Sequence, residues 1–409
     1  MQRCNYNSLQ RNINIAWKEL RHHPRKETKG SDGLSISDFI SDEQNLLRKI
    51  KDRLKSGSFH FSPLRPVRID GGKREILIAT VDDRIVGKAL LKTILPKLKR
   101  YATRSNYCPI VRTYGHVASS IGVPRAVQDM QNAFANGQHY IFETDIIDFF
   151  GSINKRRLLD VIKGHISDQK VLKLIEEIVI FEKWNCDPDD YNGEELIGIA
   201  QGSALSPLFA TIYLHDFDRQ IEKIHNVKLI RYVDDLVILC DSRKSANEAY
   251  PLVRDELKKL GLQIHPLGKE SKGRIKTNIR DVKIQPVVFL GLTFNMGQVT
   301  IARKKMNDIL DDVRFIVHAS KPSLLEKVKR VRNKIDGCVQ QYKPRPQPHY
   351  NTKDQLNALI RASQVVIDDY YHQAYRGILK QSPFANATEQ QKGRFKKFLG
   401  LDITDLILD

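Results

Sequence analysis

The spacing of apolar residues along the chain switches between a helical period and a strand period, and these switches outline the predicted elements. Residues 41–57 have the helical period. Ser41 and Gln44 are placed for a capping box at the start of this helix, and Gly57 is placed to end it. The apolar residues that share one face of the predicted helix are Leu47, Ile50 and Leu54.

The helical period returns several times further along the chain. Residues 82–100 predict a basic helix that is interrupted at Pro96. Residues 203–224 predict a helix with Ser206 as its N-cap and Pro207 in the first position, where a missing N–H has no consequence. The other segments with this period are 155–164, 168–181, the stretch before Gly261 and the basic region after residue 300.

Short runs rich in β-branched and aromatic residues predict the strands. Residues 64–80 predict a hairpin whose turn is Asp70-Gly71-Gly72. The other strand-like runs are 139–150, 231–239 and 287–294. The middle of the chain therefore reads strand, helices, strand, strand, helix, strand. This order predicts an α+β fold with an antiparallel sheet and helices on one of its faces.

Charge narrows the choice of partner. Lys and Arg total 67 against 48 for Asp and Glu, which gives a net charge of +19 and a pI near 9.6. A chain this basic indicates a polyanionic partner, and nucleic acid fits better than a membrane because no basic amphipathic helix has an aromatic face. No apolar run approaches the ~20 residues that span a bilayer, and the N-terminus lacks a signal-peptide pattern. The five cysteines lack zinc-ligand spacing, which predicts reduced thiols in a cytoplasmic protein.

Two adjacent acids, Asp234 and Asp235, interrupt the apolar run "RYVDDLVIL". Asp145 lies near the end of another predicted strand, and the order of the elements brings it beside them. Three clustered carboxylates repel one another unless hard divalent cations such as Mg²⁺ bind them. Two such ions ~4 Å apart support in-line phosphoryl transfer. The alternative is that Asp234 and Asp235 are ordinary turn residues, which aspartate favours.

An ordered series of motifs across 29–294 resembles those of bacterial reverse transcriptases of the group II intron and retron lineages. "YVDD" resembles the metal-binding signature of this family, and "ETDIIDFFGSIN" (143–154) resembles its first palm motif. The other stretches that carry the resemblance are "KGSDGLSISDF" (29–39), "FHFSPLRPVRIDGGKREILIATVDDRIVGKALL" (59–91), "GIAQGSALSPLFATIYLHDFD" (198–218), "LGLQIHPLGK" (260–269) and "FLGLTF" (289–294). The helical region after 300 resembles the family's thumb, best at "DDYYHQAYRGI" (368–378).

The resemblance implies a right-hand polymerase that copies RNA into DNA with deoxynucleotides and two Mg²⁺ ions, for which Mn²⁺ is an alternative. The implied parts are a basic N-terminal arm at 1–30, fingers at 31–135, a palm with finger-like insertions at 136–298, an α-helical thumb at 299–381 and a tail at 382–409. The composition of the first 30 residues suits an arm or a short helix with a linker.

The resemblance also implies roles for single residues. It makes Asp145, Asp234 and Asp235 the catalytic metal ligands, with the carbonyl of Ile146 beside them. The residues implied for the incoming deoxynucleotide are Lys73, Arg74, Arg84, Phe150 and Gln201. Those implied for primer and template are Tyr232, Gly202, Leu290, Gly291, Lys327 and Arg330.

Several of these implied roles compete with plainer interpretations. Phe150 would be the steric gate that rejects a 2′-hydroxyl, whereas Phe149 suits the core. Lys73 and Arg74 suit a solvated basic turn as well as a triphosphate contact. Tyr232 suits an ordinary strand position. A solvated helix face is likewise the alternative to a backbone contact by the basic helix 323–336.

Some stretches depart from the intron and retron patterns. Val233 stands where both lineages usually have alanine, and 101–124 matches the intron motif poorly. The asparagine-alanine-histidine and valine-threonine-glycine signatures of retron enzymes do not occur in the chain. With these departures the chain resembles the stand-alone "unknown group" enzymes, above all the type 2 defence-associated reverse transcriptases. That resemblance implies antiphage defence, with a partner non-coding RNA as the template.

Three other functions stay open at this point. One is a reverse transcriptase derived from a retron or a group II intron. Another is an RNA-dependent RNA polymerase, although Val233 and Phe150 differ from the glycine and the polar gate that such enzymes usually have. The third is a polymerase-like RNA-binding scaffold without catalysis, against which the retention of all three carboxylates argues.

Overall fold

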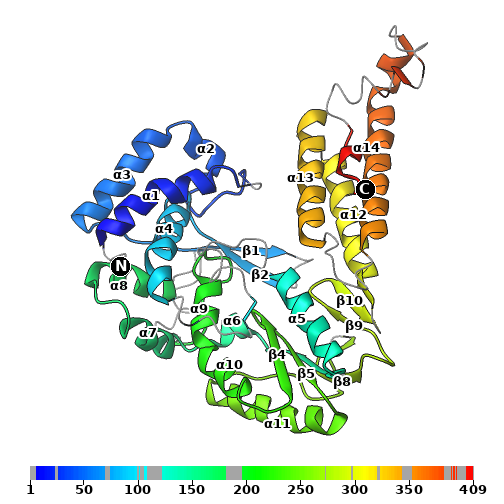
Figure 1. Ribbon diagram of the computed structural model, residues 1–409. Coiled ribbons are helices and arrows are strands. Elements are labelled where there is room, and N and C mark those ends of the chain that lie inside the picture. Colours follow the sequence, from blue (N-terminus) through cyan, green and yellow to red (C-terminus); the bar gives the residue numbers. More distant parts are fainter. Residues whose placement is uncertain are drawn as a thin grey trace. The chain divides into compact units, whose positions relative to one another are not determined.

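The computed structural model of the chain separates into two compact units, Met1–Ile279 and Arg280–Asp409 (Figure 1). The residues that it describes are 6–23, 26–69, 74–98, 101, 106–107, 122–180, 196–271, 273–295, 298–319, 323–342, 352–381, 388, 390–391, 393 and 402–408. Within these ranges, no helix has both the length and the apolar character that crossing a bilayer requires.

The chain begins with a helix that belongs to the core of the first unit. Helix α1 (Tyr6–Leu20) buries one apolar face and packs against α4 (Val81–Leu98). The buried apolar residues of α1 are Leu9, Ile13, Ala16, Trp17 and Leu20. Of the two alternatives for the first 30 residues, the structure therefore contains the short helix.

Helices α2 (Ile36–Ile40) and α3 (Glu43–Ser56) follow, and the predicted capping box lies elsewhere than expected. Ser35 caps α2, because its side chain accepts from the Asp38 N–H and the Asp38 carboxylate accepts from the Ser35 N–H. Helix α3 has Asp42 at its N-cap, and the Asp42 side chain accepts no hydrogen bond from the N–H groups of the helix, so the expected role of Ser41 was wrong. The predicted end at Gly57 is confirmed, since this glycine has φ +77°.

Helix α4 corrects another expectation. The helix continues through Pro96 to Leu98 instead of breaking at the proline. It is also buried around most of its circumference, as the almost unexposed residues Ile85, Val86 and Leu90 indicate. Packing on several sides therefore outweighs the hydrogen bond that Pro96 cannot make.

The predicted hairpin forms at the expected place. Strands β1 (Arg65–Ile69) and β2 (Arg74–Ile78) are antiparallel, with Val67 opposite Ile76. Its predicted turn, Asp70-Gly71-Gly72, lies outside the described residues.

A four-stranded sheet forms the centre of the first unit. Its strands are β3 (Tyr140–Asp145), β4 (Val227–Tyr232), β5 (Asp235–Cys240) and β8 (Asn278–Asp281), in the order β4-β5-β3-β8. Both β3 and β4 are antiparallel to β5, so the ends of β3 and β4 and the start of β5 meet at one edge. Two short paired strands, β6 (Glu270–Ser271) and β7 (Arg274–Ile275), precede β8.

The sheet is covered more completely than the sequence predicts. Leu236, Val237 and Ile238 of β5 are each almost unexposed, and successive strand residues point to opposite faces. Both faces of this strand are therefore buried, whereas helices were expected on one face. Helix α11 (Arg243–Lys259) packs against β3 and β5, and α5 (Val123–Ala135) contacts β4.

The remaining helices of the first unit are α6 (Phe149–Ser152), α7 (Lys155–Lys163), α8 (Gln169–Val179), α9 (Ser206–Tyr213) and α10 (His215–Ile221). The single helix predicted at 203–224 is thus two helices separated at Leu214. Leu205 is the N-cap, and the Ser206 hydroxyl instead donates to the Ala200 carbonyl over 2.6 Å. Ser206 therefore fastens the preceding loop rather than the helix end.

The second unit combines a three-stranded antiparallel sheet with three long helices. The strands are β9 (Val287–Phe289), β10 (Leu292–Asn295) and β11 (Gln298–Ile301). The run 287–294 is therefore a hairpin rather than one strand. The helices are α12 (Arg303–His318), α13 (Leu324–Tyr342) and α14 (Lys353–Gln381), and a short 3₁₀ turn (Thr404–Leu406) follows. All three helices contact one another, which agrees with the predicted helical region after 300.

Candidate functional site

Strand register places two of the three predicted catalytic acids directly opposite each other. Asp145 of β3 is the partner of Asp235 on β5. Tyr232 of β4 is the partner of the same Asp235 on its other side. Residues in such positions share a face and have Cβ atoms ~4.5–5.5 Å apart. Asp145, Asp235 and Tyr232 therefore form one row across the sheet.

The third acid, Asp234, lies in the two-residue turn that joins β4 to β5. Val233, the other residue of this turn, has φ +63°. Hairpin turns that match the twist of their strands need positive φ at the first central residue. A β-branched side chain rarely adopts that conformation, so the turn stores backbone strain beside the acids.

The acids influence one another electrostatically. Crowding by protein atoms, followed by the charges of Asp234 and Asp145, raises the pKa of Asp235 to about 6, and Lys276 opposes this shift. Solvent still reaches the Asp235 side chain. Crowding and the two neighbouring acids thus all disfavour a negative charge on Asp235.

A lysine and a histidine near Asp145 were not predicted from the sequence. The Lys276 ammonium donates to one carboxylate oxygen of Asp145, and His265 Nε2 lies 3.6 Å from the other. The adjoining Thr277 hydroxyl bonds that of Thr144 over 2.7 Å, which fixes the segment beside β3. The local sequence offers one signal, which is that this segment leads into an edge strand. Lys276 and Asp145 are 131 positions apart, and no spacing rule connects residues at that separation.

The chemistry of these donors suits a hard divalent cation. Carboxylate oxygens are the preferred ligands of Mg²⁺, and Asp145 Oδ1 is a buried oxygen without a hydrogen-bond partner. The side chains do not yet enclose an ion, since no group of three His, Cys, Asp or Glu residues in the described part of the chain could hold one as it stands. Asp145, Asp234 and Asp235, with the Ile146 carbonyl, would hold the metal after Asp145 exchanges Lys276 for it.

The loop with Gln201 and Gly202 lies against the fingers hairpin. The Leu77 N–H of β2 donates to the Gln201 carbonyl over 3.2 Å. Gly202 has φ +106°, and a Cβ there would lie 3.1 Å from the Leu77 carbonyl oxygen. Both the conformation and the close approach thus require glycine. The backbone of Gln201 is therefore anchored at the hairpin.

The predicted triphosphate ligands are only partly described. Arg74 begins β2, opposite Ile69, while Lys73 lies outside the described residues. Arg84 is well defined: its Nε donates to the Ala79 carbonyl over 2.9 Å and its Nη2 to the Thr28 carbonyl over 3.2 Å. These contacts make Arg84 a brace between α4 and the segment at 28–34.

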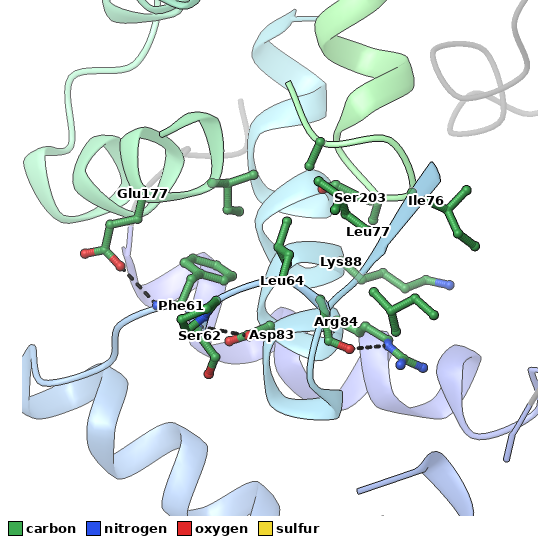
Figure 2. Close-up of a pocket in the computed structure, with 18 of the residues that line it drawn as sticks. Phe61, Ser62, Leu64, Ile76, Leu77, Asp83, Arg84, Lys88, Glu177 and Ser203 are labelled. Carbon is green, nitrogen blue, oxygen red and sulfur yellow. Dashed lines mark hydrogen bonds between the residues drawn. The ribbon is translucent and has the colours of Figure 1, made fainter. Parts of the chain in front are cut away.

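A recess of about 660 Å³ adjoins this brace (Figure 2). Figure 2 shows Asp83 and Arg84 extending from α4 below Leu64, with Ser203 from the glutamine loop nearby. Asp83 accepts from the Ser62 N–H over 3.1 Å, while its other oxygen has no hydrogen-bond partner. Burial raises the pKa of Asp83 to about 6. The recess thus has apolar walls and one carboxylate oxygen, on Asp83, that accepts no hydrogen bond.

The two adjacent phenylalanines differ in burial as the sequence suggests. Phe149 is 2% exposed and belongs to the core, whereas Phe150 is half-buried. The Phe150 carbonyl accepts from the Ile199 N–H over 2.8 Å, which fixes its backbone beside the glutamine loop. Asp148, which directly precedes the two rings, is exposed and has φ +41°.

Four predicted primer and template residues lie in the second unit. Leu290 and Gly291 form the turn between β9 and β10, with φ +52° and +78°. Lys327 is 2% exposed, and its ammonium donates to the Tyr370 hydroxyl over 2.6 Å. A phosphate contact by Lys327 would require this pairing to break. Arg330 is exposed and pairs with Glu326 of the preceding helical turn.

The arrangement of an antiparallel sheet with a row of acids at a strand turn is that of a polymerase palm. The sequence profile of the family "Reverse transcriptase (RNA-dependent DNA polymerase)" matches residues 67–294, which is more than half of the chain. The chain therefore belongs to the reverse transcriptase family. The matched region contains most of the β1–β2 hairpin, the three acids and the turn at Leu290–Gly291.

Two of the curated relatives that match are named for introns. The "Uncharacterized 91 kDa protein in cob intron" of Schizosaccharomyces pombe is 29% identical over 221 residues, which cover 51% of this chain and 24% of that protein. The "Group II intron-encoded protein LtrA" of Lactococcus lactis subsp. cremoris is 24% identical over 269 residues, which cover 64% and 40%. The chain thus spans less than half the length of either relative.

A solved structure, "Partial Cas6-RT-Cas1--Cas2 complex", matches over 62% of this chain and 41% of that chain. The sequences are 24% identical and the TM-score is 0.34. A TM-score this low supports no conclusion about function or assembly.

Proposed function

We propose that the protein is an RNA-directed DNA polymerase that extends a DNA strand on an RNA template with deoxynucleotides. The observation that carries this proposal is the register that puts Asp145 opposite Asp235, with Asp234 in the adjoining turn. Family membership and the group II intron relatives support the same activity. The net charge of +19 suits a template and primer whose backbones are anionic.

In this proposal the acids hold two divalent cations, Mg²⁺ or alternatively Mn²⁺. When bound, the ions would activate the primer 3′-hydroxyl and stabilise the leaving pyrophosphate. The chain itself mainly positions the reactants and compensates charge. Lys276, released from Asp145, would lie near the triphosphate and offset its charge. Lys73, Arg74 and Arg84 are proposed to do the same from the fingers.

The remaining proposed roles follow the shape of the site. Phe150 would lie beneath the deoxyribose and exclude a 2′-hydroxyl. Gln201 and Gly202 would contact the nascent base pair, next to which the recess of Figure 2 has room for an unpaired template base. The residues proposed to contact primer and template are Tyr232, Leu290, Gly291, Lys327 and Arg330.

A primer-extension assay tests the proposed activity. Purified protein is given an RNA template, a DNA primer, Mg²⁺, and either deoxynucleotides or ribonucleotides. We expect extension with deoxynucleotides that Asp145→Asn abolishes, and Phe150→Ala should raise ribonucleotide use. Extension with ribonucleotides alone by the unmodified protein would instead favour an RNA-dependent RNA polymerase. Absence of any Mg²⁺-dependent extension on several templates would favour the RNA-binding scaffold.

We also propose that the template is a partner non-coding RNA and that the cytoplasmic protein acts in antiphage defence. The resemblance to stand-alone defence-associated enzymes supports this. Sequencing the RNA and DNA that copurify with the protein would identify template and product together. Phage plating on cells that express the protein or its Asp235→Asn variant tests the defence role. Equal protection by the two proteins, or recovery of intron RNA, would contradict this proposal.

A further inference from the structure

The residue before the "YVDD" motif is a fully buried arginine. Arg231 of β4 and Asp218 of α10 both have side chains that are 0% exposed. Arg231 Nε donates to Asp218 Oδ1 over 2.7 Å, and Nη2 donates to Oδ2 over 2.6 Å. This parallel two-bond geometry is the strongest that an arginine and a carboxylate can form. It leaves the third nitrogen, Nη1, with a fixed direction.

The third nitrogen reaches the metal-site turn. Arg231 Nη1 donates to the carbonyl oxygen of Val233 over 3.0 Å. Val233 is the residue with φ +63°, a conformation that a β-branched side chain adopts only under constraint. Arg231 therefore fastens the strained peptide that directly precedes Asp234.

Arg231 does this from the far face of the sheet. Its strand neighbour Tyr232 is in the row with Asp145 and Asp235, and successive strand residues point to opposite faces. The guanidinium therefore does not compete with substrates or ions for the acids.

The backbone of Arg231 is held as well. Its carbonyl accepts from the Tyr107 N–H over 2.9 Å. The neighbouring Asn106, which bridges to Arg231, donates its amide to the Thr211 hydroxyl of α9 over 3.0 Å. Asp218 belongs to α10, and this helix contacts β4. The arginine is thus framed by two helices and an additional chain segment.

Stability alone does not require an ion pair here. A buried pair often contributes no more than apolar side chains of similar size, because both charges must leave water. An apolar residue cannot, however, donate a hydrogen bond to the Val233 carbonyl. What the arginine adds beyond packing is therefore a defined position for the turn.

We propose that Arg231 and Asp218 are a positioning pair, which sets the Val233–Asp234 turn in the conformation that lets Asp234 and Asp235 bind divalent cations together with Asp145. This inference rests on the proposed function, because it concerns the same metal site. Asp218 orients the guanidinium, and the guanidinium orients the turn. Neither residue would touch a metal, nucleotide or reacting atom.

The main test replaces the pair by apolar residues of similar size, Arg231→Met with Asp218→Leu. Mn²⁺ binding is measured by electron paramagnetic resonance, thermal unfolding reports folding, and single-nucleotide kinetics separate kcat from KM. We expect near-native unfolding, Mn²⁺ affinity lower by about 10-fold to 100-fold, and a fall mainly in kcat that excess metal partly restores. A folded double variant with native Mn²⁺ affinity would overturn the proposal.

A matched control uses another two-bond arginine–aspartate pair. Arg332 Nη1 lies 2.9 Å from Asp405 Oδ1, and Nη2 bonds Oδ2, in the second unit. Both residues belong to the unit that does not contain Val233. Replacing this pair by Arg332→Met with Asp405→Leu should leave Mn²⁺ affinity unchanged. Equal losses of affinity in the control and the main variant would also overturn the proposal.

Arg231→Lys keeps the proposal testable if the apolar pair does not fold. Lysine retains the charge beside Asp218, but its single nitrogen cannot reproduce the fixed fork that serves both Asp218 and Val233. We expect weaker Mn²⁺ binding in this variant, and native binding would refute the positioning role. Asp235→Asn defines which Mn²⁺ is site-specific. If Asp235→Asn leaves all Mn²⁺ binding intact, the proposed function fails, whereas native binding in the Arg231 variants defeats this inference alone.

Discussion

In the described part of the chain, two turns between paired strands have a non-glycine residue at positive φ, and they are held in different ways. Val233 in the turn between β4 and β5 has φ +63°, and its carbonyl is bound by a buried, charged arginine. Leu290 in the turn between β9 and β10 has φ +52°, and its carbonyl is 3.5 Å from the Tyr342 hydroxyl. The next residue there, Gly291, has φ +78° and fits against Tyr342.

The difference follows from what each turn carries. The first turn presents like-charged acids that repel one another, so it needs a constraint strong enough to hold them together. The second turn carries no charged side chain and offers backbone and shape alone, for which a neutral hydroxyl and a glycine suffice. Charge at a turn therefore demands a charged support, while an uncharged turn depends on close fit.

The largest expected effect separates activity from stability at the first turn. Asp235→Asn removes a proposed metal ligand and should lower nucleotide incorporation by at least ~10³-fold, because in the proposed mechanism the ions supply most of the charge stabilisation. The same change removes repulsion from Asp145 and Asp234, so thermal stability should be equal or higher. Primer extension and calorimetry on one preparation measure both. Loss of activity caused by unfolding would contradict this interpretation.

The next effect tests the charged support. Asp218→Ala leaves Arg231 buried without its carboxylate and should lower the free energy of unfolding by about 3–5 kcal/mol. Asp405→Ala removes an equivalent partner of Arg332, whose pair is partly exposed, and should change it by less than ~1 kcal/mol. Denaturant titration compares the two. Similar losses in both variants would remove the distinction between buried and exposed pairs.

A smaller effect is expected where the second turn fits against its support. In Gly291→Ala the new Cβ would lie 2.6 Å from the Tyr342 hydroxyl oxygen, and the alanine would have to keep φ +78°. We therefore expect the free energy of unfolding to fall by about 1–3 kcal/mol. Adding Tyr342→Phe removes the clashing oxygen and should recover part of this loss. A double-mutant cycle by denaturant titration measures the coupling. Additive losses would show that the hydroxyl does not constrain the turn.

The smallest effect concerns Asp83 and the way in which the free energy of unfolding depends on pH. Since the pKa of Asp83 is raised to about 6, the folded protein binds this proton more tightly than the unfolded chain does. The stabilisation from Asp83 is complete below its usual pKa near 4 and is lost as pH rises through about 6. Between pH 8 and pH 5 it should add about 1 kcal/mol.

Asp83→Asn is the control for this pH dependence. Its free energy of unfolding should vary less than that of the unmodified protein over the same range, by about the 1 kcal/mol expected from Asp83. Identical pH profiles would mean that Asp83 titrates normally in the folded protein.

The sequence predicted those parts of the fold that depend on local patterns. β-branched runs predicted the strands that carry Asp145 and Asp235, and helical spacing predicted α7, α8 and α11. The motif resemblance identified the family that the profile match then established. The difference in burial between Phe149 and Phe150 could also be predicted, because the motif that contains them implies different surroundings for the two rings.

What could not be predicted depends on contacts between distant residues. The Lys276–Asp145 and Arg231–Asp218 pairs exist only once the sheet has formed, and neither pairing has a sequence signature. The capping box was misplaced because Ser35 and Ser41 offer similar local chemistry, and packing decides between them. Pro96 likewise gave a correct local signal that burial of the surrounding helix outweighs.

The proposed DNA synthesis depends most on whether the acids gathered at the first turn hold divalent cations. The direct measurement is the number of Mn²⁺ ions bound, by electron paramagnetic resonance, in a complex with an RNA template, a dideoxy-terminated DNA primer and the next deoxynucleotide. We predict two ions per chain, both lost or strongly weakened in Asp145→Asn and in Asp235→Asn. If those variants bound the same number of ions with the same affinity, the acids at the first turn would not be the metal site.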